Sequence, residues 1–128
     1  MIVDSSAMVA VALREPGFED VFDKLASPGS AGIGTPTLVE TGLVLGARFG
    51  REPLGLLSRM LAEFDVTPVP FGDEHWREAN RAYWRFGRGR HEAKLNFGDC
   101  MAYAVARLAC EPLLFVGDDF SKTDLARA

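Results

Sequence analysis

The stretch from Asn96 to Cys110 constrains the fold more than any other part of the chain. Between Cys100 and Cys110 the only charged residue is Arg107, and small or apolar residues cover every side. A helix that is apolar all round is a buried helix, so this segment is predicted to lie in the interior. Its first turn carries Asp99, a carboxylate whose burial costs several kcal/mol unless something compensates it.

Two interpretations of Asp99 are open. In the first it caps the helix, with Asn96 starting the helix and Asp99 bonding back to it. The helix dipole then stabilises the charge by about 0.3–1 kcal/mol, which leaves most of the burial cost uncompensated. In the second, Asp99 faces a polar pocket and holds a metal ion together with other acids.

The composition is that of an ordinary globular protein. The 128 residues predict one domain, long enough to bury a core without disulfides or structural metals. The net charge of −4 gives no overall basic field, so any nucleic-acid site must rest on local patches. Neither a signal peptide nor an apolar run of about 20 residues is found, so we expect a cytoplasmic protein with no membrane partner. Cys100 and Cys110 share one helix, cannot bridge each other, and are expected as reduced core residues.

Short apolar runs alternate with segments of helical periodicity. Strands are predicted at 1–3, 31–34, 66–69 and 112–116, the third at a sheet edge because it contains Pro68. Helices are predicted at 5–13 (capped by Ser5 or Ser6), 18–25, 35–50, 53–64, 74–86 (capped by Asp73) and 96–110. This alternation predicts an α/β fold over residues 1–128, with a mostly parallel sheet covered on both faces.

Acidic residues flank the predicted strands. Asp4 directly follows the first strand, and Asp118 and Asp119 follow the last. Asp99 opens the helix before the last strand, and Glu40 lies one turn into the helix after the second. Ligands bind beyond the carboxyl ends of parallel strands, so these acids are expected to converge at one edge. Clustered carboxylates repel one another unless a hard cation such as Mg²⁺ or Mn²⁺ is present, which predicts a metal site suited to phosphodiester hydrolysis.

Taken singly, each acid has a simpler interpretation. An acid after a strand is often a turn residue or a helix cap, which applies to Asp4 and Asp118. Glu40 can instead pair with Arg14 or Arg48. The expected convergence of several acids at one edge favours the metal site.

Four segments together resemble the PIN-domain family, and more narrowly the VapC-type toxin ribonucleases of bacterial toxin–antitoxin pairs. They are MIVDSSA (1–7), PTLVET (36–41), GRGRH…LNFGDC (87–100) and PLLFVGDDF…TDL (112–125). The segments occur in the family's order along the whole chain. The resemblance implies a three-layer α/β/α sandwich, Mg²⁺- or Mn²⁺-dependent endoribonuclease activity, a homodimer, and inhibition by a small antitoxin protein.

The resemblance also implies roles for individual residues. Asp4, Glu40 and Asp99 match the family's acidic core, with Asp4 and Asp99 as its metal ligands. Ser6 matches a polar position beside the first acid, and Asn96 matches one beside the third.

The fourth acid is where this chain departs from the family pattern. Many members carry an Asp three residues before the phenylalanine that follows the last strand, and that position is Gly117 here. Asp119, immediately before Phe120, matches the other acidic position of the motif. Asp118 is an alternative and Asp124 a more remote one, and the sequence leaves the choice open.

Basic residues are concentrated between positions 77 and 94. These 18 positions hold six of the chain's 14 basic residues and only two acids. Arg77, Arg81 and Arg85 share one helix face, which is either a solvated face or a phosphate track leading to the acids. The candidate RNA contacts are Arg85, Arg88, Arg90 and Lys94. Tyr83, Trp84 and Phe86 are expected mainly in the core, with Trp84 as a possible stacking platform for a base.

Two other functional classes remain as alternatives. A receiver-type phosphoacceptor domain has similar length and element order, but it normally needs paired acids after its first strand and a lysine after its last. This chain offers only Asp4 and the run 117–119 at those places. A non-catalytic PIN-like binding module is the second alternative, and the presence of all the core acids favours an enzyme over it.

Overall fold

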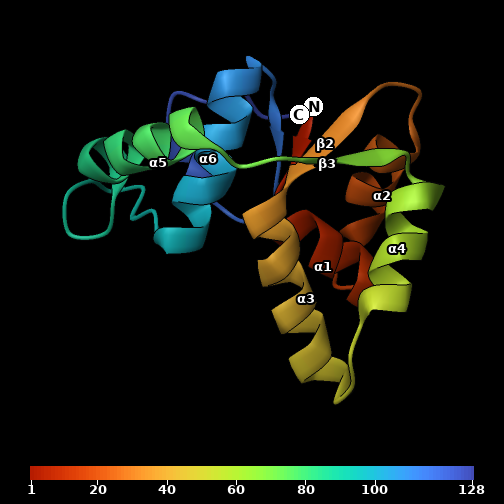
Figure 1. Ribbon diagram of the computed structural model, residues 1–128. Coiled ribbons are helices and arrows are strands. Elements are labelled where there is room, and N and C mark those ends of the chain that lie inside the picture. The colour runs from red at the N-terminus through yellow and green to blue at the C-terminus, as the bar shows by residue number, and fades with distance from the viewer.

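A four-stranded, all-parallel sheet forms the centre of the computed structural model, which describes residues 1–128 (Figure 1). The strand order is β3-β2-β1-β4. In the register, Ile2 pairs with both Gly32 and Leu113. The strands are β1 (Ile2–Val3), β2 (Ala31–Gly34), β3 (Val66–Val69) and β4 (Leu113–Leu114). β3, which contains Pro68, lies at an edge as predicted, because proline has no N–H for a second neighbour.

Helices cover both faces of this sheet, which confirms the α/β/α sandwich. α5 and α6 lie on one side, α1, α2 and α4 lie on the other, and α3 extends away from the sheet (Figure 1). No helix is both long and apolar enough to cross a membrane. The helices are α1 (Ser5–Leu13), α2 (Phe18–Ala26), α3 (Thr35–Phe49), α4 (Leu54–Glu63), α5 (Asp73–Phe86) and α6 (Phe97–Ala109), followed by the 3₁₀ helix η1 (Asp119–Lys122).

Neighbouring residues of β1 and of the adjacent edge strand β4 enter separate hydrophobic cores. Ile2 and Leu113 pack with α5 and α6, whereas Val3 and Leu114 pack with α1, α2 and α4. Successive side chains of a strand point to opposite faces, so a strand covered on both sides is apolar without interruption. This explains why the strands are continuous apolar runs in the sequence.

α6 is buried from Cys100 to Ala106, apart from the partly exposed Met101, but its last residues are exposed. Small side chains let it approach β2 so closely that a Cβ on Gly34 would lie 2.8 Å from Cγ2 of Val105. The prediction of burial on every side is wrong for the last turn, which is exposed from Arg107 onward because it projects past the sheet (Figure 1). Cys110, expected in the core, is therefore exposed.

Two predicted helix caps and one strand end are corrected by the structure. Asp4, not a serine, is the N-cap of α1, because its carboxylate accepts from the Ser6 N–H. Gly72 precedes α5, and Asp73 lies within the first turn. β4 ends after Leu114, since the N–H of Val116 donates to Oγ of Ser6 instead of to a strand.

Candidate active site

Acids from four separate segments meet at the carboxyl edge of the sheet. Asp4 follows β1, Glu40 lies in the second turn of α3, Asp99 in the first turn of α6, and Asp119 at the start of η1. The charges of Asp4, Glu40 and Asp119 all act on Asp99, and the charge of Glu40 acts on Asp4. The strand order reverses between β1 and β4, and open α/β sheets bind ligands at such a switch point.

Asp4 is held by Ser6. Oδ2 of Asp4 accepts from the backbone N–H of Ser6 at 3.1 Å and from its hydroxyl at 2.6 Å. The Ser6 hydroxyl in turn accepts from the N–H of Val116 at 3.0 Å, which ties Asp4 to the end of β4. Burial raises the pKa of Asp4, the bonds from Ser6 oppose the rise, and the charge of Glu40 adds to it. Both bonds from Ser6 use Oδ2, and Oδ1 of Asp4 is not a sealed, unpartnered atom.

Asp99 is both a helix cap and a member of the acid cluster. The N–H of Asn96 donates to Oδ2 of Asp99, and the N–H of Asp99 donates to Oδ1 of Asn96, each at 2.9 Å. Burial raises the pKa of Asp99 to about 6; the bond from Asn96 opposes the rise, and the charges of Asp4, Asp119 and Glu40 reinforce it. The two interpretations of Asp99 are thus compatible, because the cap uses only one carboxylate oxygen.

Glu40 is fixed from two sides. The Ser5 hydroxyl donates to Oε1, and a Cβ on Gly98 would overlap Oε2. The alternative in which Glu40 pairs with Arg14 or Arg48 is wrong, since neither arginine makes an ion pair with it. Ser5 and Gly98 were not identified from the sequence; the only signal was a glycine in the first turn of an otherwise tightly packed helix.

The structure separates the candidates for the fourth acid. The charge of Asp119 acts on Asp99. Asp118 and Asp119 are both exposed, but the charge of Asp118 is not among those that act on Asp99. Asp124 accepts from the Tyr103 hydroxyl at 2.7 Å and pairs with two arginines, so it belongs to a different cluster. This arrangement favours Asp119.

Most of the basic residues on α5 have acidic partners. Arg77 pairs with Asp73, Arg81 with Glu78, and Arg85 with Asp124. This face of α5 is therefore better described as a solvated face of ion pairs than as a row of cations available to phosphates. The loop after α5 carries exposed cations that form no ion pair: Arg88, Arg90 and Lys94.

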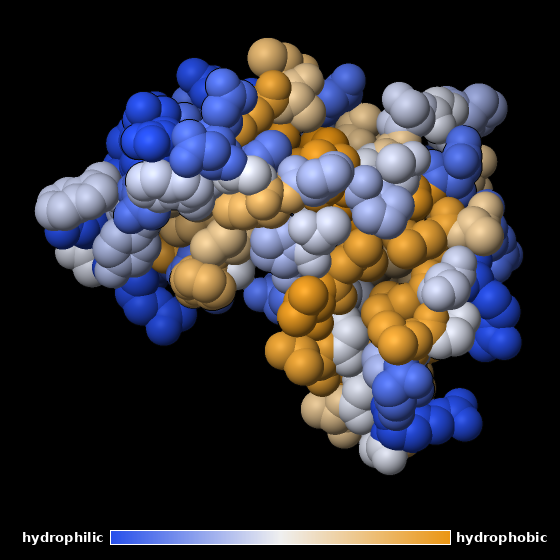
Figure 2. Space-filling view, in the orientation of Figure 1, coloured by the Kyte–Doolittle hydropathy of each residue, from blue (hydrophilic) through white to orange (hydrophobic).

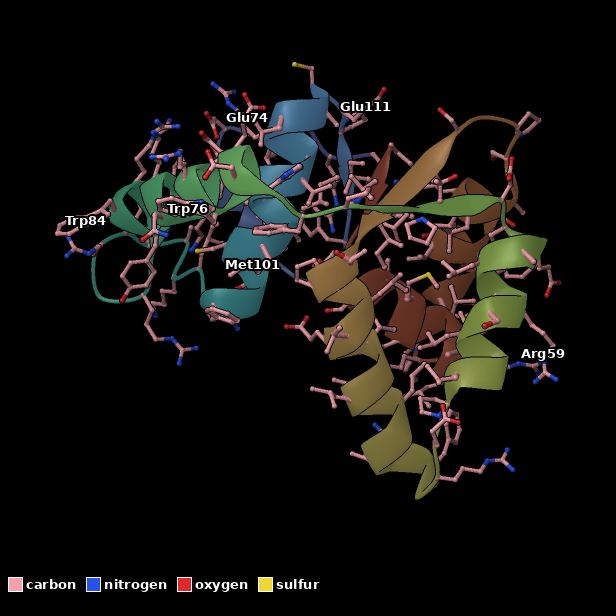
Figure 3. All side chains as sticks on the ribbon, viewed as in Figure 1. Arg59, Glu74, Trp76, Trp84, Met101 and Glu111 are labelled. Atoms are coloured by element: carbon pink, nitrogen blue, oxygen red, sulfur yellow. The ribbon has the colours of Figure 1, made fainter.

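The aromatic residues of α5 are less buried than expected. Only Phe86 is in the core, whereas Tyr83 and Trp84 are exposed because their side of α5 faces solvent. The Arg90 guanidinium lies 3.5 Å above the ring of Trp84, at the far end of α5 (Figure 3).

The donors at this site suit a hard divalent cation. All are carboxylate oxygens, the ligands that Mg²⁺ and Mn²⁺ prefer. They do not form a closed group of three metal ligands. Instead, Asp4 and Asp99 each use Oδ2 in a helix cap and keep Oδ1, a donor set that fits an ion retaining several water ligands. Repulsion between neighbouring carboxylates contributes to both raised pKa values, and a bound cation would offset it.

Known proteins are similar in sequence to this chain over nearly its whole length. A family model described as the PIN domain matches residues 1–125. Ribonuclease VapC36 of Mycobacterium tuberculosis is 44% identical over 126 residues, which cover 98% of this chain and 91% of that protein. Ribonuclease VapC of Mycolicibacterium smegmatis is 39% identical over 127 residues, covering 98% of each chain.

Solved structures share the fold. The crystal structure of Mycobacterium tuberculosis VapC20, described as a toxin that cleaves the sarcin–ricin loop, has a TM-score of 0.78 and covers 99% of this chain and 97% of that one. A toxin–antitoxin complex from Klebsiella pneumoniae has a TM-score of 0.69 and covers 96% and 92%. Both are 18% identical in sequence, so they show the fold alone. Together with the family model and the curated relatives, the fold establishes that this chain belongs to the PIN-domain family, among the VapC ribonucleases.

Proposed function

We propose that this protein is the endoribonuclease toxin of a toxin–antitoxin pair, and that it hydrolyses RNA phosphodiester bonds in the cytoplasm with Mg²⁺ or Mn²⁺ at Asp4 and Asp99. Membership of the VapC ribonucleases supports the reaction. The observation that carries the metal assignment is the pair of carboxylates at the switch point, in each of which the helix cap uses Oδ2 and leaves Oδ1 outside the cap.

The chain's own residues divide the remaining tasks. A divalent cation at Asp4 and Asp99 would supply a Lewis acid and a more acidic attacking water. Glu40, fixed by Ser5 and by the backbone at Gly98, is placed to orient that water and accept its proton. Asp119 adds negative charge on the side of η1.

Neither histidine is positioned to replace this chemistry. Nδ1 of His75 accepts from the N–H of Gly72, and Nδ1 of His91 accepts from the N–H of Ala93. Both rings therefore stabilise local backbone in and beside α5, and the carboxylates are the groups left to move protons at the switch point.

Cleavage of single-stranded RNA by purified protein tests the proposal. Excess EDTA is expected to abolish cleavage, and Asp99→Asn is expected to lower its rate about 100-fold or more, since it removes a charged ligand but keeps an oxygen for the cap. Asp73→Asn, the same change in the first turn of α5, is the matched control and should leave the rate unchanged. Full activity in EDTA, or equal cleavage by wild type and Asp99→Asn, would contradict the metal assignment. RNA binding without cleavage would favour the binding module.

An antitoxin and a second copy of the chain are the proposed protein partners. A groove of about 460 Å³ lies between α3 and α4, and exposed apolar side chains line it, among them Val39, Leu43 and Leu54. Figure 2 shows apolar residues gathered over these two helices. Contiguous exposed apolar surface marks protein interfaces, which supports a partner there. Light scattering of the isolated protein tests the homodimer, and rescue of growth by a co-expressed neighbouring gene product tests the antitoxin.

A further inference from the structure

A second, smaller groove lies beside the acids, between α5 and α6. Its volume is about 260 Å³, near the lower end for small-molecule sites. α5 contributes Ala79, Asn80 and Tyr83, and α6 contributes Phe97, Cys100 and Met101. Figure 3 labels Met101 on the α6 side of this groove.

Two aromatic rings in this groove are accessible to solvent. The side chain of Phe97 is 80% exposed, and that of Tyr83 is 41% exposed. Phe97 therefore contributes little to the hydrophobic core, although it lies at the start of the most buried helix. Ring faces that line an open groove are available to stack on a flat ligand.

The groove begins one residue from the acid cluster. Phe97 and Cys100 bracket Asp99 in α6, and Glu40 contacts Gly98 between them. The groove is therefore lined by the same turn of α6 that carries Asp99.

Cations without ion pairs border the groove on its other side. The Tyr83 hydroxyl donates to the backbone carbonyl of Arg88 at 3.4 Å. The guanidinium of Arg90 lies 5.9 Å from the centre of the Tyr83 ring. These two arginines are placed to hold phosphates of the same strand whose scissile bond lies at the acids.

We propose that this groove binds one unstacked base of the RNA substrate, held between the rings of Phe97 and Tyr83. The inference rests on the proposed ribonuclease function and names a substrate subsite for it. Single-stranded RNA is recognised by stacking bases on aromatic side chains within a basic surface, and here two aromatic side chains line a groove near the acids and near arginines that make no ion pair. Asn80 uses Nδ2 to donate to the Trp76 carbonyl, so its Oδ1 is the acceptor left for the edge of the base.

Binding of a short single-stranded RNA carrying one 2-aminopurine tests the subsite. In EDTA, wild type is expected to bind the RNA and quench its fluorescence. Phe97→Ala should weaken binding about 5- to 150-fold and abolish the quenching, because one stacked base is lost. Phe97→Trp keeps an aromatic face and should retain both. Phe49→Ala, the same change at the far end of α3, is the matched control and should bind like wild type.

Thermal unfolding and cleavage kinetics separate the possible outcomes. Phe97→Ala should unfold at the wild-type temperature, since its ring is mostly exposed, and with Mg²⁺ it should raise the KM for RNA more than it lowers kcat. If wild type cleaves RNA but Phe97→Ala has unchanged affinity, quenching and KM, the subsite is overturned and the ribonuclease stands. If Phe97→Ala changes the mass of the particle in solution but not RNA binding, the groove is a contact between copies and the subsite is also overturned. If wild type never cleaves RNA, yet quenching depends on Phe97, the base subsite stands and the ribonuclease falls.

Discussion

At the scale of single residues, the site is built from side chains that have two roles each. Asp4 is the N-cap of α1, and Asp99 bonds back to the N-cap Asn96 in the capping box of α6; an N-cap contributes about 1 kcal/mol to stability. Because a carboxylate has two oxygens, the cap leaves the second oxygen for a cation. The two interpretations of Asp99 that the sequence left open, a capping residue and a metal ligand, therefore do not exclude each other.

Gly98 gives the sharpest test at this scale. Gly98→Ala is expected to fold as stably as wild type, because alanine favours the helix and only the flexible end of Glu40 must move. RNA cleavage should fall about 10-fold or more, since the carboxylate that orients the water is displaced. Urea unfolding and cleavage rates measure the two effects separately.

Gly55 in α4 provides the control. A Cβ there meets nothing within 4 Å, so Gly55→Ala should stabilise the protein by roughly 0.5–1 kcal/mol with an unchanged cleavage rate. An active Gly98→Ala enzyme would show that Glu40 does not depend on contact with the start of α6.

At the scale of elements, the C-terminal segment holds the turn that carries Asp119. The Arg127 guanidinium donates to the carbonyls of Phe115 and Gly117, both at 3.3 Å, and the N–H of Leu113 donates to the carbonyl of Ala126. In the sequence alone, this segment shows only a candidate acid, Asp124. Its role depends on contacts made after the chain has returned to the edge of β4, and no local pattern encodes those contacts.

Asp124 anchors the same segment to α5 and α6. Partial burial raises the pKa of Asp124. The hydrogen bond from the Tyr103 hydroxyl and the charges of Arg85 and Arg107 together outweigh that rise, so the pKa lies below its ordinary value of 3.8. A lowered pKa stabilises the folded state above the unfolded pKa, and this contribution is lost as the pH falls through the folded pKa. Asp124→Asn should therefore cost about 1 kcal/mol of unfolding free energy at pH 7 and much less at pH 3.

Urea unfolding at the two pH values checks this expectation. Asp73→Asn, which removes an exposed pair with Arg77, is the control and should change stability by less than about 0.5 kcal/mol at either pH. If the loss of unfolding free energy caused by Asp124→Asn stayed the same down to pH 3, the charge of the Asp124 carboxylate could not be its cause. Tyr103→Phe combined with Asp124→Asn then measures how strongly the hydroxyl and the carboxylate are coupled.

At the scale of the whole molecule, the site lies where two independently packed halves meet. Asp4 begins α1, which packs in one hydrophobic core, and Asp99 begins α6, which packs in the other. The surface is concave between α6 and α3 (Figure 2). A cation shared by Asp4 and Asp99 would thus link the two faces of the sheet at their common edge.

Thermal unfolding with Mn²⁺ tests this link. A ligand that binds only the folded state stabilises it by about 2.7 kcal/mol at 100 times its dissociation constant, so Tm should rise with the Mn²⁺ concentration. The double variant Asp4→Asn/Asp99→Asn should show no rise, and Asp73→Asn should respond like wild type. An equal rise in the double variant would place the bound ion elsewhere.

The sequence by itself determined the fold class, the order of the elements and the set of acids from which the site is drawn. Apolar periodicity, prolines and residues at strand ends are local properties, and local properties are readable without knowing what packs against what. Only the tertiary structure shows that the charge of Asp119 acts on Asp99, which arginines are already paired, and that Phe97 lines an open groove. These features depend on charges and surfaces that distant segments bring together. α6 is an example: its sequence predicts burial on every side, but the helix is buried only as far as the sheet and the neighbouring helices cover it.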